Sequence, residues 1–294
     1  MKFSSPNLRN FIQQTERLFW YAFLFFIPFQ ARIIIEQTGG GWRFVEWRPI
    51  SLFGTDILIL GLLFFWLIAL IQGRAGLKWA IKDWFLIGFL VVAGLSIRGS
   101  LNEKIGLYSW IKLVEFGLLF LFVRSYAVKI FSARASLWVF VSSGILQALI
   151  GFGQFLRQGD FGFQILGESV LSPSLNGIAS FYTETGDKII RAYGLTPHPN
   201  ILATILLLAT LALVYLFLTN TKLGAWRLAG YSAAGAILLF GLLSTFSRTA
   251  IALLVLLILV GCITAFIKAV RERRTNLVRI TAFSLVVVAL FAFI

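Results

Sequence analysis

Residues 191–200 read Arg-Ala-Tyr-Gly-Leu-Thr-Pro-His-Pro-Asn, and they join the longest polar stretch of the chain to an apolar run that continues to residue 218. These ten positions hold a basic residue, a glycine, two prolines, an asparagine and the only histidine of the chain. Packing alone does not explain such a density of special residues at the start of an apolar helix. We therefore expect the function of the chain to reside at this junction.

The composition around this junction is that of an integral membrane protein. Of the 294 residues, 59% are hydrophobic and 13% are charged, and the mean hydropathy is +0.89. A bilayer core about 30 Å thick requires roughly 20 apolar residues in a helix, and runs of this length recur between short polar segments. Since lipid offers the backbone no hydrogen-bond partner, these runs must be helical. The sequence therefore predicts an all-α fold, a polytopic transmembrane helix bundle.

Nine apolar runs are predicted to be membrane helices. They cover residues 18–35, 52–72, 81–97, 105–123, 136–156, 199–218, 228–246, 249–267 and 279–294. They divide the chain into a five-helix region (1–156), a long loop (157–198) and a second helical region (199–294). The first run lacks the small residues of a cleavage site and is predicted to be an uncleaved signal-anchor. The last run has no polar residues to close it, so we expect the natural polypeptide to continue beyond residue 294.

The basic residues favour one orientation in the membrane. With the N-terminus in the cytoplasm, sixteen Lys and Arg residues fall in cytoplasmic segments and nine in outer segments, as the positive-inside rule requires. The net charge of +14 then follows from membrane topology and gives no reason to expect a nucleic-acid partner. The loop 157–198 becomes extracytoplasmic. Its recurring apolar residues predict short amphipathic helices on the outer membrane surface, and an insertion without function is the alternative.

Two arginines are the first candidates for binding a ligand. Arginine stays charged and offers a planar fork of donors that suits phosphate oxygens, so Arg191 and Arg248 are predicted to bind a diphosphate at the membrane surface. Arg248 opens an apolar helix, where the positive end of the helix dipole disfavours a cation unless an anion is bound there too. Ser247, with Ser244 and Thr245, is expected to cap this helix and support the site. The alternative is that each arginine only extends its charge to the membrane interface.

Three further residues are candidates with simpler explanations. His198 changes its charge near neutral pH and could act as a catalytic general base. Alternatively, Pro197-His198-Pro199-Asn200 only forms the first turn of a helix, with its polar side chains satisfying free backbone groups. Asn200 is then a supporting residue. Arg98 lies at the end of the third predicted helix, where it could add to a basic outer surface.

Charges inside the predicted helices are few. Lys112 and Glu115 are three positions apart and share a helix face, so they can neutralise each other. Asp56 is expected to cap the second helix together with Thr55. The sequence has no Walker-type loop, no dinucleotide fingerprint and no zinc-protease motif, and Cys262 is its only cysteine. We therefore expect neither a metal ion nor another cofactor.

Four segments resemble the O-antigen ligase and O-antigen polymerase family. They are Pro28-Phe-Gln with a following basic residue, the stretch Leu107-Tyr-Ser-Trp-Ile-Lys-Leu-Val-Glu-Phe, the pair Arg191-Ala-Tyr-Gly and Pro197-His-Pro-Asn, and Ser247-Arg-Thr-Ala. The predicted helices, their orientation and the long outer loop agree with this resemblance along the whole chain. Members of the family also carry a second outer loop, with a histidine assigned to acceptor activation, and further helices. This chain stops before that loop.

The resemblance implies a metal-independent glycosyltransferase of the bacterial plasma membrane. Its donor would be a polyprenyl-diphosphate-linked glycan and its acceptor a lipid, a glycan or a protein side chain. Arg191 and Arg248 match diphosphate ligands of the family, whereas the position of His198 need not be histidine. Two alternatives stay open. A transporter or flippase of lipid-linked glycans would place charges near the bilayer midplane, and an incomplete chain could serve as an inactive membrane scaffold.

Overall fold

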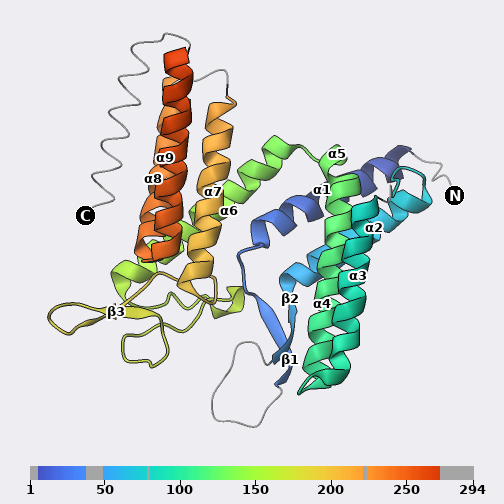
Figure 1. The fold of residues 1–294 in the computed structure, drawn as a ribbon, viewed down its shortest axis with the longest axis horizontal. Helices are drawn as coiled ribbons and strands as arrows, with labels where there is room; N and C mark the ends of the chain where they lie inside the picture. Colours follow the sequence, from blue (N-terminus) through green and yellow to red (C-terminus); the bar gives the residue numbers. More distant parts are fainter. Residues whose placement is uncertain (1–5, 38–48, 78–79, 221–223, 272–294) are drawn as a thin grey trace. The chain divides into compact units, whose positions relative to one another are not determined.

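The computed structural model of the chain describes residues 6–37, 49–77, 80–220 and 224–271 (Figure 1). Most of these residues are helical, in α1 (Pro6–Phe26), α2 (Gly54–Ile71), α3 (Ile81–Leu95), α4 (Glu103–Phe122), α5 (Val128–Ile130), α6 (Ala133–Arg157), α7 (Pro199–Leu218), α8 (Ala225–Ser244) and α9 (Arg248–Arg271). The described residues also contain two pairs of antiparallel strands, β1 (Arg32–Gln37) with β2 (Pro49–Phe53) and β3 (Ser180–Tyr182) with β4 (Lys188–Ile190). The prediction of a helical, membrane-type fold is confirmed in this general form.

Two compact units make up the chain. The first contains Met1–Ser143, Gly162–Glu168 and Tyr215–Asn220, and the second contains Gly144–Phe161, Ser169–Val214 and Thr221–Ile294. Helices α6 and α7 each contribute residues to both units. The predicted site residues divide accordingly. Arg98 belongs to the first unit, and the second unit contains the others, which are Arg191, His198, Asn200, Ser247 and Arg248.

The core of the first unit is built around aromatic side chains. Trp20 of α1 stacks on Phe131, with ring centroids 5.0 Å apart, and packs against Phe122 at the end of α4. Its indole N–H donates to Ser136 Oγ at 2.9 Å, so the polar atom of the buried ring has a partner. Leu62 of α2 completes the contact and is fully buried. This core therefore joins α1, α2 and α4.

The prediction of a first helix over 18–35 is wrong in its second half. α1 ends at Phe26, and the residues that follow form β1, which pairs antiparallel with β2. Pro28 has no N–H to continue the helix, and its ring disfavours a helical conformation at Ile27. The β-branched run 33–35 then favours an extended strand. A prediction based on the length of an apolar run takes neither of these effects into account.

Nine membrane spans are not supported. Among the described residues, five helices are long and apolar enough to cross a bilayer, namely Gly54–Ile71, Glu103–Ile130, Ala133–Arg157, Pro199–Leu218 and Ala225–Ser244. The second continues from α4 through a π-helical turn into α5. Helix α3 has 15 residues and is therefore about 22 Å long, shorter than a hydrocarbon core of about 30 Å. The predicted helix 279–294 lies outside the described residues.

Glycines allow the helices of the second unit to approach closely. A Cβ atom added to Gly144 of α6 would lie 2.6 Å from the Cβ of Ala209 on α7. One added to Gly241 of α8 would lie 2.5 Å from the Cβ of Ala148 on α6. Close contact through small residues is typical of helix pairs in membranes, where van der Waals packing drives association. The two glycines therefore let α7 and α8 pack on the same helix, α6.

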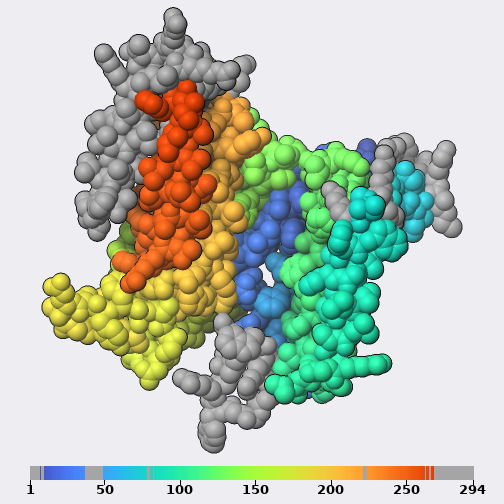
Figure 2. Space-filling view, viewed as in Figure 1, coloured from blue at the N-terminus to red at the C-terminus, as the bar shows by residue number. Residues whose placement is uncertain are grey.

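The long loop after α6 forms a hairpin where amphipathic helices were expected. β3 and β4 pair antiparallel, and Leu171, Ile190 and Tyr193 form a small core beneath them. The N–H of Ala179 donates to Tyr193 Oη at 2.7 Å, which connects the hairpin to the segment before α7. In the space-filling view this part of the loop, in yellow, lies against the ends at which α7 and α9 begin (Figure 2). The prediction of amphipathic helices is therefore wrong.

The contact between α6 and α8 can be tested with two glycines of α8. Gly241→Ala should lower the thermal unfolding temperature of the purified chain, because overpacking costs about 1–3 kcal/mol and the neighbouring atoms include the backbone of Ala148. Gly230→Ala is the control, since a Cβ there meets no atom within 4 Å. The control should leave stability unchanged or raise it by up to about 1 kcal/mol. Equal melting temperatures for Gly241→Ala and wild type would contradict the close helix contact.

Candidate functional site

A pocket of about 600 Å³ lies in the second unit, where the turn between α8 and α9 meets the start of α7. It is lined by Ser180, Phe181, Arg191, Asn200, Phe246, Ser247, Arg248, Thr249 and Ile251. Four predicted site residues, Arg191, Asn200, Ser247 and Arg248, are thus brought together from segments distant in the sequence. None of these lining residues is acidic. The two arginines therefore give the pocket a positive potential that suits an anion.

Arg191 is held in place by two hydrogen bonds. Its Nε donates to the carbonyl oxygen of Thr245 at 2.6 Å, and its Nη2 donates to Asn200 Oδ1 at 2.8 Å. Burial lowers the pKa of Arg191, but an arginine stays protonated at neutral pH because its ordinary pKa is so high. A guanidinium has five N–H donors, so the two bonds leave three for a ligand. Arg191 thus has both a structural contact and free donors at the pocket.

Arg248 is the first residue of α9, and its side chain is exposed. Within the described part of the chain it makes no hydrogen bond or ion pair. The free N–H groups of the first helical turn and the guanidinium lie at the same end of α9, where the helix dipole is positive. An anion bound here would interact favourably with all of them. The pocket therefore offers hydrogen-bond donors from two arginines and from a helix start, and no acidic residue lines it.

The hydroxyl groups of Ser244 and Thr245, in the turn before α9, have a different role from the expected one. Ser244 Oγ donates to the carbonyl oxygen of Gly241 at 2.7 Å, and Thr245 Oγ1 donates to that of Leu242 at 2.6 Å. Both side chains therefore satisfy the end of α8, and the expectation that they cap α9 is wrong. The backbone N–H of Ser247 donates to Thr245 Oγ1 at 3.3 Å, which closes the turn.

Phe246 gives this turn an unusual backbone. Its φ is +49°, in the left-handed region that normally requires glycine at the end of a helix. The side chain packs against Phe181 of β3, with ring centroids 4.4 Å apart, and against Phe155 of α6 at 5.5 Å. These aromatic contacts offset the cost of the strained backbone. They also connect the hairpin, α6 and the α8–α9 turn at one wall of the pocket.

Two buried glutamines of α6 support the segment that carries Arg191. Gln154 Oε1 accepts the N–H groups of Tyr193 at 3.2 Å and Gly194 at 2.7 Å, and its Nε2 donates to the carbonyl oxygen of Gly194 at 2.9 Å. Gln147 Oε1 accepts the N–H of Leu195 at 2.8 Å. Both side chains are fully buried. They provide the partners that a non-helical backbone needs inside an apolar unit.

Sequence reasoning missed these glutamines, although a signal was present. Gln147 and Gln154 are seven residues apart in the otherwise apolar run 136–156. Residues at this spacing lie on the same face of a helix. Two amides on one face of a membrane helix indicate a polar partner that must be bound there. Gly194 accounts for the close approach, because its φ is +60° and an added Cβ would lie 2.6 Å from Gln147 Oε1.

His198 does not line the pocket. Its Nδ1 accepts the backbone N–H of Asn200 at 3.2 Å, and its carbonyl oxygen accepts the N–H of Leu202 at 3.2 Å. The side chain and the backbone of His198 therefore both stabilise the first turn of α7. This arrangement agrees with the structural alternative for His198. The catalytic role stays a prediction without geometric support.

Arg98 does not belong to the pocket in the second unit. It lies in a 3-10 turn (Ser96–Gly99) that directly follows α3, and its side chain is exposed. It is part of the first unit, and the residues that line the pocket all come from the second unit. The expected contribution of Arg98 to the site therefore stays a prediction.

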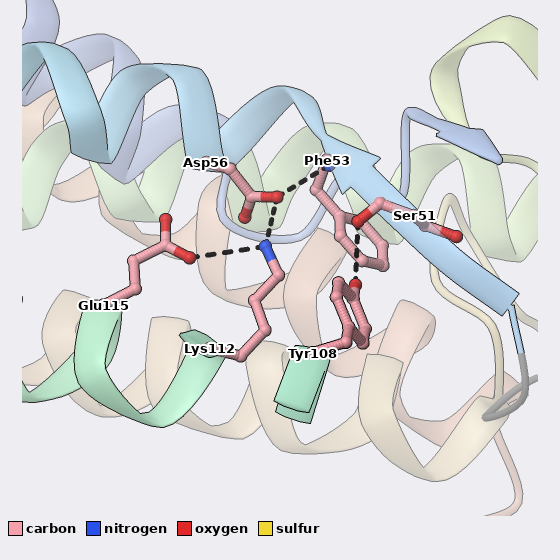
Figure 3. Close-up of polar contacts among 6 residues, drawn as sticks. All are labelled: Ser51, Phe53, Asp56, Tyr108, Lys112 and Glu115. Carbon is pink, nitrogen blue, oxygen red and sulfur yellow. Dashed lines mark hydrogen bonds and ion pairs between the residues drawn. The ribbon is translucent and has the colours of Figure 1, made fainter. Parts of the chain in front are cut away.

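A separate group of charged residues lies on α2 and α4 of the first unit (Figure 3). Lys112 Nζ on α4 forms ion pairs with Glu115 Oε2 at 3.3 Å and with Asp56 on α2. Asp56 Oδ2 also accepts the N–H of Phe53 at 2.8 Å and so caps α2. The expectation that Lys112 and Glu115 neutralise each other is therefore incomplete, because two carboxylates share one ammonium group. Asp56 and Lys112 also line a pocket of about 500 Å³ with mainly apolar walls.

The support from α6 can be tested by replacing Gln154 with leucine. Gln154→Leu removes three hydrogen bonds to buried backbone groups of Tyr193 and Gly194. Since each buried group left without a partner costs about 1–3 kcal/mol, thermal unfolding of the purified chain should move to a clearly lower temperature. Ser142→Ala on the exposed side of α6 is the control and should melt like wild type. An unchanged melting temperature for Gln154→Leu would show that the segment is held by other contacts.

Comparison of the chain with protein-family models, with curated proteins and with solved structures gives no match. Within the described residues, no group of three or more His, Cys, Asp or Glu side chains is placed to hold a metal ion. The functional assignment of the pocket therefore depends on its own geometry and on the resemblance of its segments. The geometry is that of an anion site, formed by Arg191, Arg248 and the start of α9.

Proposed function

We propose that the chain binds a polyprenyl-diphosphate-linked glycan and belongs to a membrane glycosyltransferase of the O-antigen ligase or polymerase type. One observation carries this proposal: Arg191 and Arg248, from different segments, line one pocket that has no acidic wall. The first residues of α7 and α9 both contribute to it, and α7 is a candidate membrane span. The pocket thus lies at the level where a span begins. A diphosphate on a membrane-anchored isoprenoid is presented at this level.

The chemistry of the pocket suits a diphosphate leaving group. An acceptor hydroxyl would attack the anomeric carbon of the glycan, forming a new C–O bond while the bond to the diphosphate breaks. Negative charge then develops on the departing diphosphate oxygen, and positioned arginine donors stabilise it. The hydroxyl proton must go to a base, and no residue of the described pocket is assigned that role. The glycan acceptor would be a lipid, another glycan or a protein side chain.

The aromatic wall of the pocket fits the rest of such a donor. Phe181 and Phe246 present ring surface beside the arginines. Sugar rings and isoprenoid units both have apolar faces that pack on aromatic side chains. We place the reaction at the extracytoplasmic face of a bacterial plasma membrane, with the N-terminus in the cytoplasm, as the distribution of basic residues favours.

A transporter or flippase of lipid-linked glycans is the second candidate. The observation that favours it is the ion-paired group of Asp56, Lys112 and Glu115 on candidate membrane spans. Charges within a membrane are rare and often mark a translocation path. Proteoliposomes separate the two functions. A flippase moves a fluorescent polyprenyl-diphosphate glycan between leaflets without an acceptor, whereas a transferase attaches the glycan to the acceptor.

Arg248 provides the sharper test of diphosphate binding. Arg248→Gln should weaken the binding of a fluorescent polyprenyl diphosphate by about tenfold or more, because a hydrogen bond to a charged group contributes about 1.5–3 kcal/mol. Thermal stability should not change, since the side chain has no partner within the described residues. Titration of the purified chain in detergent measures the affinity. Arg227→Gln, exposed on α8, is the control and should bind like wild type.

Arg191 should behave differently from Arg248. Arg191→Gln should weaken binding of the same probe and also lower the melting temperature, because the carbonyl oxygen of Thr245 and the amide of Asn200 lose their donor. Measurement of both quantities on both variants distinguishes a ligand contact from a structural one. Wild-type affinity in both variants would refute diphosphate binding at this pocket.

A further inference from the structure

A second basic pocket lies in the first unit, apart from the residues proposed to bind the donor. It has a volume of about 380 Å³ and is lined by Gln13, Glu16, Arg17, Arg74, Tyr126, Lys129 and Ile130. Its three cations come from three different elements. Arg17 belongs to α1, Arg74 follows the end of α2, and Lys129 belongs to α5. Tertiary structure therefore brings together charges that the sequence separates.

These cations are not neutralised by carboxylates. In the described part of the chain, Arg17, Arg74 and Lys129 form no salt bridge, whereas Arg124 nearby in the sequence pairs with Asp83 and Lys104 pairs with Glu36. Arg74 Nε donates to the neutral amide of Gln72 at 2.6 Å. The pocket therefore keeps a net positive charge. Such a pocket attracts an anion.

Glu16 is the one acidic residue among those that line this pocket. Its side chain lines the pocket but is only 1% exposed, and it accepts one hydrogen bond from Tyr126 Oη at 3.2 Å. Its other oxygen, Oε1, is buried and has no hydrogen-bond partner among the described residues. Burial raises the pKa of Glu16, while the bond from Tyr126 and the charges of Arg74 and Arg17 lower it.

The position of the pocket selects the kind of anion. Arg74 lies just beyond the end of the candidate span Gly54–Ile71, and Lys129 lies at the end of the candidate span Glu103–Ile130. Both spans thus end at this pocket, so it lies at a membrane boundary. Leu18, Ile71 and Val128, which are near the lining residues in the sequence, are 68–71% exposed and can contact acyl chains. A phosphate held on a lipid satisfies both the charges and this apolar rim.

We infer that the pocket formed by Glu16, Arg17, Arg74, Tyr126 and Lys129 binds the phosphate of an anionic phospholipid headgroup. The three cations contact the phosphate oxygens, and the Glu16 carboxyl group lies beneath them. Basic pockets between membrane helices recognise anionic lipids in this way. The inference does not depend on the proposed function, because no residue of the diphosphate pocket takes part.

Lipid titration of the full chain in a neutral detergent, followed by native mass spectrometry, tests this inference. Phosphatidylglycerol should bind wild type in preference to phosphatidylcholine. The triple variant Arg17→Gln, Arg74→Gln, Lys129→Gln should bind phosphatidylglycerol about tenfold or more weakly, as expected for the loss of several charge contacts. Arg134→Gln, an exposed arginine at the start of α6 that does not line the pocket, is the matched control and should keep wild-type affinity.

Glu16→Gln keeps the inference testable if the triple variant folds poorly. Glutamine carries no negative charge and its amide can donate a hydrogen bond, so this variant should bind phosphatidylglycerol at least as tightly as wild type. Equal binding of phosphatidylcholine and phosphatidylglycerol would overturn the inference, because a site for an anionic headgroup must distinguish the two net charges. Inorganic phosphate is the second probe. If millimolar phosphate displaced the lipid and bound as tightly as the lipid does, the ligand would be free phosphate and not a lipid headgroup. Full affinity in a folded triple variant would overturn the site itself.

Discussion

The backbone of residues 192–196 is buried although it forms neither helix nor strand, and two glutamine side chains make this possible. A peptide group without a partner in apolar surroundings costs several kcal/mol, roughly as much as a small domain can lose before it unfolds. Gln147 and Gln154 remove this cost for the residues that lie between Arg191 and α7. The positions of Arg191 and of Asn200 therefore follow from amides in the middle of a different helix. The α8–α9 turn depends on the same segment, because Ala192 donates to the carbonyl oxygen of Ser244 at 3.0 Å.

The sequence was most informative where one physical quantity dominates. Long apolar runs predicted α2, α4, α6, α7 and α8, since an apolar backbone in lipid has no alternative to the helix. The same reasoning failed after Phe26, where Pro28 and a β-branched run outweigh hydropathy. It also failed in the long loop, whose hairpin depends on contacts with Tyr193. Apolar content therefore predicts that a segment avoids water, and residue type decides whether its backbone forms a helix or a strand.

The sequence predicted most residues of the candidate site, but it did not predict how they are arranged. Arginine, glycine, proline and asparagine at the start of an apolar helix indicated a special site, and the structure places Arg191, Asn200, Ser247 and Arg248 on one pocket. No local pattern could show that Arg191 bonds the end of α8, or that Lys112 pairs with Asp56 of another helix. These contacts join residues more than fifty positions apart. His198 was singled out for its chemistry, whereas its nitrogen stabilises a helix start.

Four cations of the described residues lie in three kinds of environment, and the environment decides what each one can bind. Lys112 has two carboxylate partners, so it offers no net positive charge to a ligand. Within the part of the chain that the structure describes, Arg191 bonds neutral groups, Thr245 and Asn200, and so keeps its charge. Arg17 and Lys129 are exposed beside a carboxyl group that has one unused oxygen. Counting basic residues would treat all four as equivalent.

The two hydrogen bonds of Arg191 have a consequence for the entropy of binding. A free arginine loses about 2 kcal/mol of rotamer freedom when a ligand fixes it, but Arg191 is already fixed by Thr245 and Asn200. Arg248 is exposed and unbonded within the described residues, so a ligand that it contacts must immobilise it. In the proposed complex, the preorganised Arg191 would therefore set where the anion rests. The exposed Arg248 would reach an arriving anion early and so favour its capture.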